Sequence, residues 1–198
     1  QNYRQDLTTI KSYIYDVNPV LVGVDGGADA LLEFGYQPNI IIGDMDSVSD
    51  MALQSGAELI VHAYPDGRAP GLERLQKLNL KTQILPAPGT SEDIALLLAY
   101  EKGADLIVAV GTHVSMIDFL EKGRLGMGST FLVRLKVGSI LVDARGVSKI
   151  YQGRIKLHYL LQLTIAGILV ITIVLSQTQW SRDFLRAFWL QFKTLFGL

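Results

Sequence analysis

The sequence predicts an α/β fold with a parallel sheet flanked by helices, followed by a C-terminal transmembrane helix and an amphipathic tail helix. Three observations support this fold class. Over roughly the first 145 residues, short continuous apolar runs alternate with segments of helical spacing, which is typical of a parallel sheet buried on both faces. Residues 159–176 contain no formal charge, and residues 179–198 repeat an aromatic side chain at every fourth position.

The apolar runs are expected to be strands, and the segments between them helices. Gly35 follows the first helix and Pro38 lies beyond it, which are ordinary stop signals. The predicted strands are Val20–Val24, Ile40–Ile42, Glu58–Val61, Thr82–Leu85 and Leu106–Val110. The predicted helices are Ala28–Phe34, Asp50–Ser55, Pro70–Leu78 and Ser91–Lys102. Further on, Gly128-Ser129-Thr130 is expected to cap a helix through residues 131–137, and residues 139–142 to form a strand that ends at Asp143.

The chain is expected to divide into an α/β domain (1–150), a linker (151–158), a transmembrane helix (159–176) and an amphipathic helix (179–198). Eighteen uncharged residues are about the minimum that crosses a hydrocarbon core of ~30 Å at 1.5 Å per residue. A buried core helix, or two strands, is the alternative for that segment. The tail suits either a helix in the membrane interface or a docking or dimerisation helix, so a homodimer is one expectation.

Charge and composition limit the function classes. The 198 residues are 49% hydrophobic with a formal net charge of −1, so no attraction to nucleic acid is expected. There is no cysteine, which excludes disulfides and thiolate metal sites. Basic residues at 145, 149, 154 and 156 precede the span, which favours a cytoplasmic α/β domain. The chain starts at Gln1 without a signal-peptide pattern, which suggests a fragment whose N-terminal region is missing.

Carboxylates stand where strands end or helices start, at Asp25, Asp44, Asp46 and Asp93. Carboxyl ends of parallel strands share one edge of a sheet, where ligands bind in such folds. Clustered carboxylates repel one another, and Mg²⁺ with a phosphorylated ligand would neutralise them. Gly26-Gly27 and Gly43 would let backbone approach the ligand closely. The alternative is that Asp25 and Asp93 cap helices and Asp46 is a turn residue.

Two blocks, "DGGADALLEFGYQPNIIIGDMDS" and "TSEDIALLLAYEKGADLIVAVG", resemble the catalytic domain of thiamin pyrophosphokinases. The resemblance implies that Asp44, Asp46 and Asp93 are catalytic and hold Mg²⁺, with ATP or another nucleotide as a further ligand. Asp25 also falls on one of the aspartates with which that family handles Mg²⁺ and pyrophosphate. The full ligand-binding set that we predict from the sequence is Asp25, Gly26, Gly27, Ser47, Arg68, Ser91, Glu92 and His113.

Departures from that family argue against thiamin as the substrate. The family's Lys-Asp-x-Thr-Asp reads "GTSED" here, so only the final Asp is retained. Its Gly-Gly-Arg-x-Asp-His segment reads "GTHVSMIDF", which lacks the Arg and the His. The β-sandwich domain that completes the thiamin pocket is replaced by the apolar segment.

A longer resemblance covers nearly the whole chain. The stretches "YPDGRAPGLERL", "GTSEDIALLLA" and "FLEKGRLGMGSTFLVRLKVGSILVDARGV", followed by an apolar segment, are similar to SteA-type cytokinetic ring proteins. The resemblance implies a bacterial inner-membrane protein of cell division or cell separation, with a membrane-bound division partner.

Two basic side chains outside the carboxylate set are further candidates. Arg68, between Pro65 and Pro70, would bind a phosphate, or else it belongs to a solvated turn. His113 follows the last strand and would titrate near neutrality, or else it faces solvent.

Three hypotheses follow from these patterns. The first is a regulatory or scaffolding domain that binds a nucleotide or pyrophosphate with Mg²⁺ at the membrane. The second is an active pyrophosphokinase or phosphotransferase. The third is a purely structural protein whose acidic residues serve as caps and turns.

Overall fold

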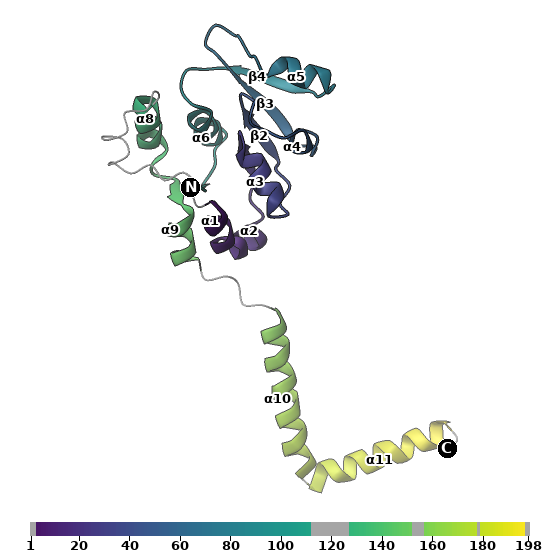
Figure 1. Ribbon diagram of the computed structural model, residues 1–198. Helices are drawn as coiled ribbons and strands as arrows, with labels where there is room; N and C mark the ends of the chain where they lie inside the picture. The colour runs from purple at the N-terminus through teal and green to yellow at the C-terminus, as the bar shows by residue number, and fades with distance from the viewer. Residues whose placement is uncertain (1–2, 112–126, 152–156, 178, 197–198) are drawn as a thin grey trace. The chain divides into compact units, whose positions relative to one another are not determined.

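The computed structural model describes residues 3–111, 127–151, 157–177 and 179–196. The chain divides into two compact units, Gln1–Gly153 and Arg154–Leu198. The first is an α/β unit with parallel strands flanked by helices, as the sequence predicts, and the second contains two helices (Figure 1).

Four of the predicted strands form one parallel sheet, with neighbours in the order of the chain. Ile41 of the second strand is in register with Leu59 of the third, and Ile42 with Ile60. The strands are β1 (Val22–Val24), β2 (Ile40–Gly43), β3 (Glu58–Ala63) and β4 (Thr82–Pro86).

Helices cover this sheet because both of its faces are apolar. On one face, Ile41 and Leu59 pack in a core with residues of α3 (Gly27–Glu33), α4 (Asp50–Leu53) and α5 (Leu72–Lys77). On the other face, Ile42 and Ile60 pack against Ile94 of α6 (Ser91–Glu101). Adjacent residues of one strand therefore enter different cores, which explains why the strands read as unbroken apolar runs.

The remaining strands of the unit form a second sheet instead of extending the first. β5 (Ile107–Ala109) pairs in parallel with β6 (Leu141–Asp143), and α8 (Met127–Val137) precedes β6. The two sheets are held together through side chains, because Leu21 beside β1 and Val108 of β5 pack in one apolar cluster.

Three helices of the α/β unit were not predicted. These are α1 (Tyr3–Thr9), α2 (Lys11–Val17) and α9 (Ala144–Ile150). They bury Leu7, Ile14 and Val147 in the same cluster that joins the two sheets, together with Ile10 between α1 and α2. The two ends of the α/β unit thus share one core.

The second unit consists of α10 (Leu157–Gln177) and α11 (Gln179–Phe196). Within α10, the segment Tyr159–Ser176 has a mean hydropathy of 2.2 and is not covered by other parts of the protein. Among the residues that the structure describes, this is the one helix whose length and composition suit a membrane crossing.

Candidate functional site

The turns that follow β1 and β2 interlock at the carboxyl end of the sheet. Asp25 takes a left-handed conformation with φ 47°, and its Oδ1 accepts a hydrogen bond of 3.1 Å from the backbone N–H of Asp44. The backbone N–H of Asp25 donates to the carbonyl of Ile42 at 3.0 Å. A Cβ on Gly43 would overlap the Asp25 carboxylate, so glycine is required at that position.

The loop Asp44-Met45-Asp46 exposes two carboxylates on either side of a buried anchor. β2 ends at Gly43, and Met45, fully buried, has a φ of 66°. The backbone N–H of Asp46 donates to Oδ1 of Asp44 at 3.0 Å, and Arg74 donates to the Met45 carbonyl at 2.9 Å. The two acidic side chains are both exposed, and the strand ends before them at Gly43.

Asp25 is an acidic residue whose surroundings raise its pKa. Burial raises the pKa of its carboxyl above the ordinary value, and the nearby charge of Asp44 raises that pKa further. Hydrogen bonds from the Asp44 backbone and the Ser91 hydroxyl, together with the charge of His62, lower the pKa again in part. The structure therefore brings Asp25, Asp44 and Ser91 together, three residues of the predicted site.

His62, near the end of β3, belongs to this site and was not predicted. Its Nδ1 lies 3.3 Å from the Ser91 hydroxyl, and its Nε2 lies 3.0 Å from the carbonyl of Ala87. A carbonyl only accepts, so Nε2 carries a proton and donates to the carbonyl of Ala87. The strand was expected to end at Val61, so the sequence did not indicate that His62 lies at the ligand edge.

Asp93 is held as a helix cap at the start of α6. Thr90 and Asp93 form a reciprocal capping box with bonds of 3.0 and 3.2 Å, and Ser129 donates to Oδ2 of Asp93 at 2.7 Å. Asp93 is 1% exposed, and its Oδ1 has no hydrogen-bond partner among the described residues. A helix cap was the alternative that the sequence left open for Asp93, and it is the arrangement that the structure shows.

The described residues contain no group of three or more His, Asp or Glu side chains arranged to hold a metal ion. Asp44, Asp46 and Asp93 therefore do not form a ready three-carboxylate site. The close pair is Asp25 and Asp44, with Asp46 beside it.

The other predicted ligand-binding residues have varied surroundings. Gly26 caps α3 near the carbonyl of Ser47, and space is open beside Gly27. Glu92 forms an ion pair of 2.7 Å with Arg134. Arg68 pairs with Asp66 of its own turn at 2.6 Å, and its guanidinium lies over the Tyr64 ring. His113 lies outside the described residues.

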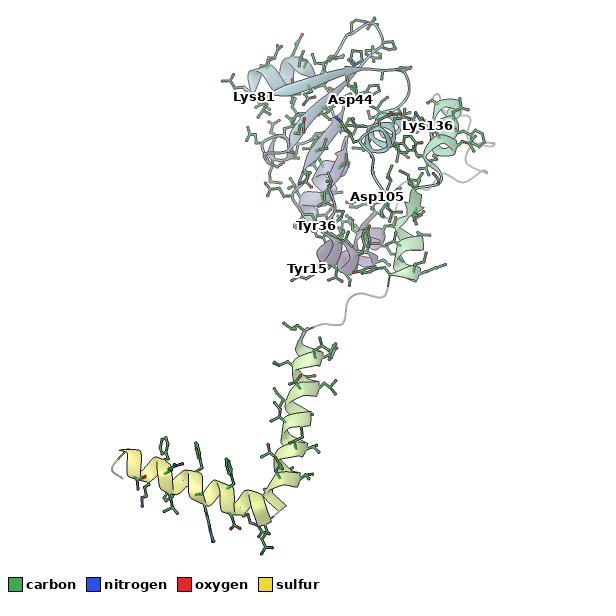
Figure 2. All side chains as sticks on the ribbon, turned by 180° about the vertical axis from the view of Figure 1, so that it is seen from behind. Tyr15, Tyr36, Asp44, Lys81, Asp105 and Lys136 are labelled. Atoms are coloured by element: carbon green, nitrogen blue, oxygen red, sulfur yellow. The ribbon has the colours of Figure 1, made fainter. Side chains whose placement is uncertain are left out.

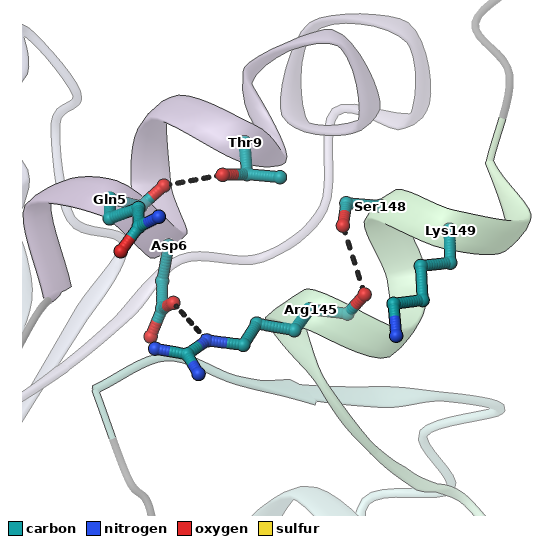
Figure 3. Close-up of a pocket in the computed structure, with 6 residues that line it drawn as sticks. All are labelled: Gln5, Asp6, Thr9, Arg145, Ser148 and Lys149. Atoms are coloured by element: carbon teal, nitrogen blue, oxygen red, sulfur yellow. Dashed lines mark hydrogen bonds and ion pairs between the residues drawn. The ribbon is translucent and has the colours of Figure 1, made fainter.

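A separate cavity of about 290 Å³ lies between α1 and α9. There Arg145 reaches from α9 to Asp6 on α1, with 3.4 Å between Nε and Oδ1 (Figure 3). Tyr151 adds a hydrogen bond of 2.8 Å to Asp16. None of the predicted site residues lines this cavity, which lies between the first and the last described helix of the α/β unit.

The structure is that of an α/β protein that carries an apolar helix long enough to cross a membrane. Residues 145–196 match the family model of the SteA-like C-terminal domain, a range that runs from α9 through α10 and α11. The match supports a SteA-type protein and confirms that predicted resemblance. It is also consistent with a cell-division-related protein. No curated protein matches the chain. The thiamin pyrophosphokinase-like fold stays a prediction.

Proposed function

We propose that this is a membrane-anchored bacterial protein of cell division or cell separation whose α/β unit binds a phosphorylated ligand together with Mg²⁺. The SteA-like C-terminal domain supports the cellular role, and α10 supports an anchor in the inner membrane. The α/β unit acts in the cytoplasm as a regulatory or scaffolding domain, with a membrane-bound division protein as its partner.

One observation carries the ligand site: the contact between Asp25 and Asp44 at the carboxyl edge of the sheet. Burial and the charge of Asp44 raise the pKa of Asp25, so this edge holds negative charge at a cost. The carboxylate of Asp46 has no hydrogen-bond partner in the part of the chain described here. The rim formed by Asp25, Asp44 and Asp46 at this edge of the sheet fits Mg²⁺, which often binds one or two carboxylates plus the phosphates of a ligand.

Each residue of the rim, and each of the two residues beside it, has a defined task in this proposal. Asp44 and Asp46 hold the ion, and Asp25 orients the loop through the Asp44 backbone. Ser91, which opens α6, turns its hydroxyl proton from Asp25 to a phosphate oxygen, and His62 lies beside that hydroxyl, with its Nδ1 3.3 Å from the Ser91 oxygen. When bound, the ion neutralises phosphate charge.

Calorimetry on the full chain in detergent tests this site. The titrants are Mg²⁺ with nucleotides, and Mg²⁺ with diphosphate-containing cell-wall precursors. We expect Mg²⁺-dependent binding that the double variant Asp44→Asn with Asp46→Asn abolishes. Asp105→Asn is the matched control, an exposed aspartate before β5 that lies apart from Asp44 (Figure 2).

Absence of binding across this panel by a folded protein would refute the ligand site. Nucleotide turnover that Asp46→Asn abolishes would replace binding by catalysis, the alternative of a pyrophosphokinase or phosphotransferase.

Alkaline carbonate extraction of bacterial membranes tests the anchor. We expect the full chain to stay in the membrane pellet. Ile168→Arg, in the middle of α10, should reduce that fraction because a central Arg costs about 2.5–3.5 kcal/mol on insertion scales. Ile150→Arg, at an exposed position of α9, is the control. A wild-type chain that washes off the membrane would contradict the anchor.

A further inference from the structure

The amphipathic helix α11 is the largest feature that the proposed function leaves unexplained. Phe184, Phe188 and Phe192 recur at every fourth position and are all exposed, Phe184 to 70%. At about 100° per residue these three side chains fall within one narrow arc of the helix. An apolar arc of this kind needs a partner that removes it from water.

The charged side chains of α11 lie away from that arc. Arg182, Arg186 and Lys193 fall within about 40° of one another on the helical wheel, roughly opposite the aromatic arc. Trp189 lies between the two faces, and the Lys193 amine is 5.0 Å from the centre of its ring. An aromatic ring at the border between an apolar face and a basic face is typical of a helix at a membrane–water interface.

The position of α11 in the chain points to the same partner. Only Thr178 separates the end of α10 at Gln177 from the start of α11 at Gln179. One residue extends a chain by at most about 3.6 Å, so α11 begins at the bilayer surface where α10 ends. Its own charges, three basic and one acidic, make α11 unsuited to a second crossing.

We propose that α11 binds the bilayer surface in the plane of the membrane, with its aromatic arc in the acyl boundary and its basic strip on anionic phospholipid headgroups. This inference rests on the membrane anchor of the proposed function and is independent of the sheet-edge ligand. With the α/β unit in the cytoplasm, α11 occupies the opposite face of the membrane. A helix held in that plane fixes the depth of α10.

Self-association is the competing use of the same face. A coiled-coil seam requires apolar residues that alternate at three and four positions, with aliphatic side chains at most of them. Phe184, Phe188 and Phe192 are instead spaced by four, and their bulky rings occupy the arc. The pattern therefore favours lipid as the occupant.

The tryptophans make the test direct, because Trp180 and Trp189 are the two tryptophans of the chain and both belong to α11. The full chain is reconstituted at low protein-to-lipid ratio in vesicles of phosphatidylglycerol and phosphatidylcholine. Tryptophan emission is then measured with and without brominated acyl chains. We expect blue-shifted emission that the brominated lipid quenches, and weaker quenching in pure phosphatidylcholine.

Two substitutions separate the arc from the rest of the helix. Phe188→Asp should remove most of the quenching and shift the emission to the red. Leu190→Asp adds the same charge at an exposed position outside the aromatic arc and should leave both signals nearly unchanged.

Three results would overturn the inference. The first is unquenched, red-shifted tryptophan while carbonate extraction shows the chain still in the membrane, which leaves the anchor intact. The second is equal quenching in both lipid mixtures. The third is emission that changes with protein-to-lipid ratio alongside crosslinked dimers, which would assign the face to a second copy.

Discussion

The ion pair between Asp6 and Arg145 links residues 139 positions apart, and its removal should destabilise the α/β unit. Asp6 is 1% exposed, whereas the Arg145 side chain is 57% exposed. Asp6 also accepts from the backbone N–H of Gly111 at 3.3 Å, and Arg145→Gln removes the ion pair with Arg145 from this buried carboxylate.

The expected cost lies between two known limits. Breaking a buried pair costs about 3–5 kcal/mol, and a surface pair contributes about 0–1 kcal/mol. Because one partner here is buried and the other is half exposed, we expect Arg145→Gln to cost about 2 kcal/mol. For a unit of this size that corresponds to a Tm lower by about 4–8 °C.

Thermal unfolding of the full chain in detergent, followed by circular dichroism, measures this cost. Lys149→Gln is the matched control, because it removes the same charge one turn further along α9, where no ion pair is formed within the described residues. We expect that control to shift stability by no more than about 0.5 kcal/mol. Adding Asp6→Asn to Arg145→Gln should recover part of the loss, since the buried charge is then gone. Equal Tm shifts for Arg145→Gln and Lys149→Gln would refute the reasoning.

Three further predictions concern the sheet edge and its helix. Burial and the charge of Asp44 raise the pKa of Asp25, so ionised Asp25 lowers the stability of the folded state increasingly as pH rises through that pKa. Asp25→Asn should therefore raise the Tm in Mg²⁺-free buffer at neutral pH and lose this advantage in acid. An unchanged Tm at neutral pH would contradict the prediction. Gly43→Ala should lower the free energy of unfolding, measured with urea, by about 1–3 kcal/mol, because the added Cβ would overlap the Asp25 carboxylate. Thr90→Ala should cost about 1 kcal/mol by the same measurement, because it removes the side-chain bond to the Asp93 N–H, whereas the exposed Thr8→Ala provides a control that should be nearly neutral.

The sheet could be predicted because its information is local. Ile40–Ile42 and Glu58–Val61 are continuous apolar runs, and the structure confirms both as buried strands. The N-terminal helices were missed although a helical signal was present. Leu7, Ile10 and Ile14 follow helical spacing, but Ile10 precedes α2 without a side-chain cap, so no start signal marked that helix.

The contacts of the site could not be predicted, because they depend on how distant segments cross. His62 meets Ser91 only because α6 returns across the sheet to β1 and β2, which brings its first residue to the edge where β3 ends. Asp93 carries the opposite lesson. Its spacing of three from Thr90 already allowed a cap, whereas the resemblance to a catalytic aspartate predicted a metal ligand.

Unfavourable conformations and charges gather at one edge of the sheet, and this distribution bears on function more than any single acidic residue does. Asp25 and Met45 both have positive φ, and the Asp25 carboxyl is half buried beside a second carboxylate. A turn that served packing alone would be more stable with Asn at Asp25 and with an unstrained residue at Met45. The ligand that we propose would offset this strain, at an edge where parallel sheets bind ligands. The structural alternative requires the same features to contribute stability, so the sign of the Asp25→Asn effect separates that alternative from the proposed ligand site.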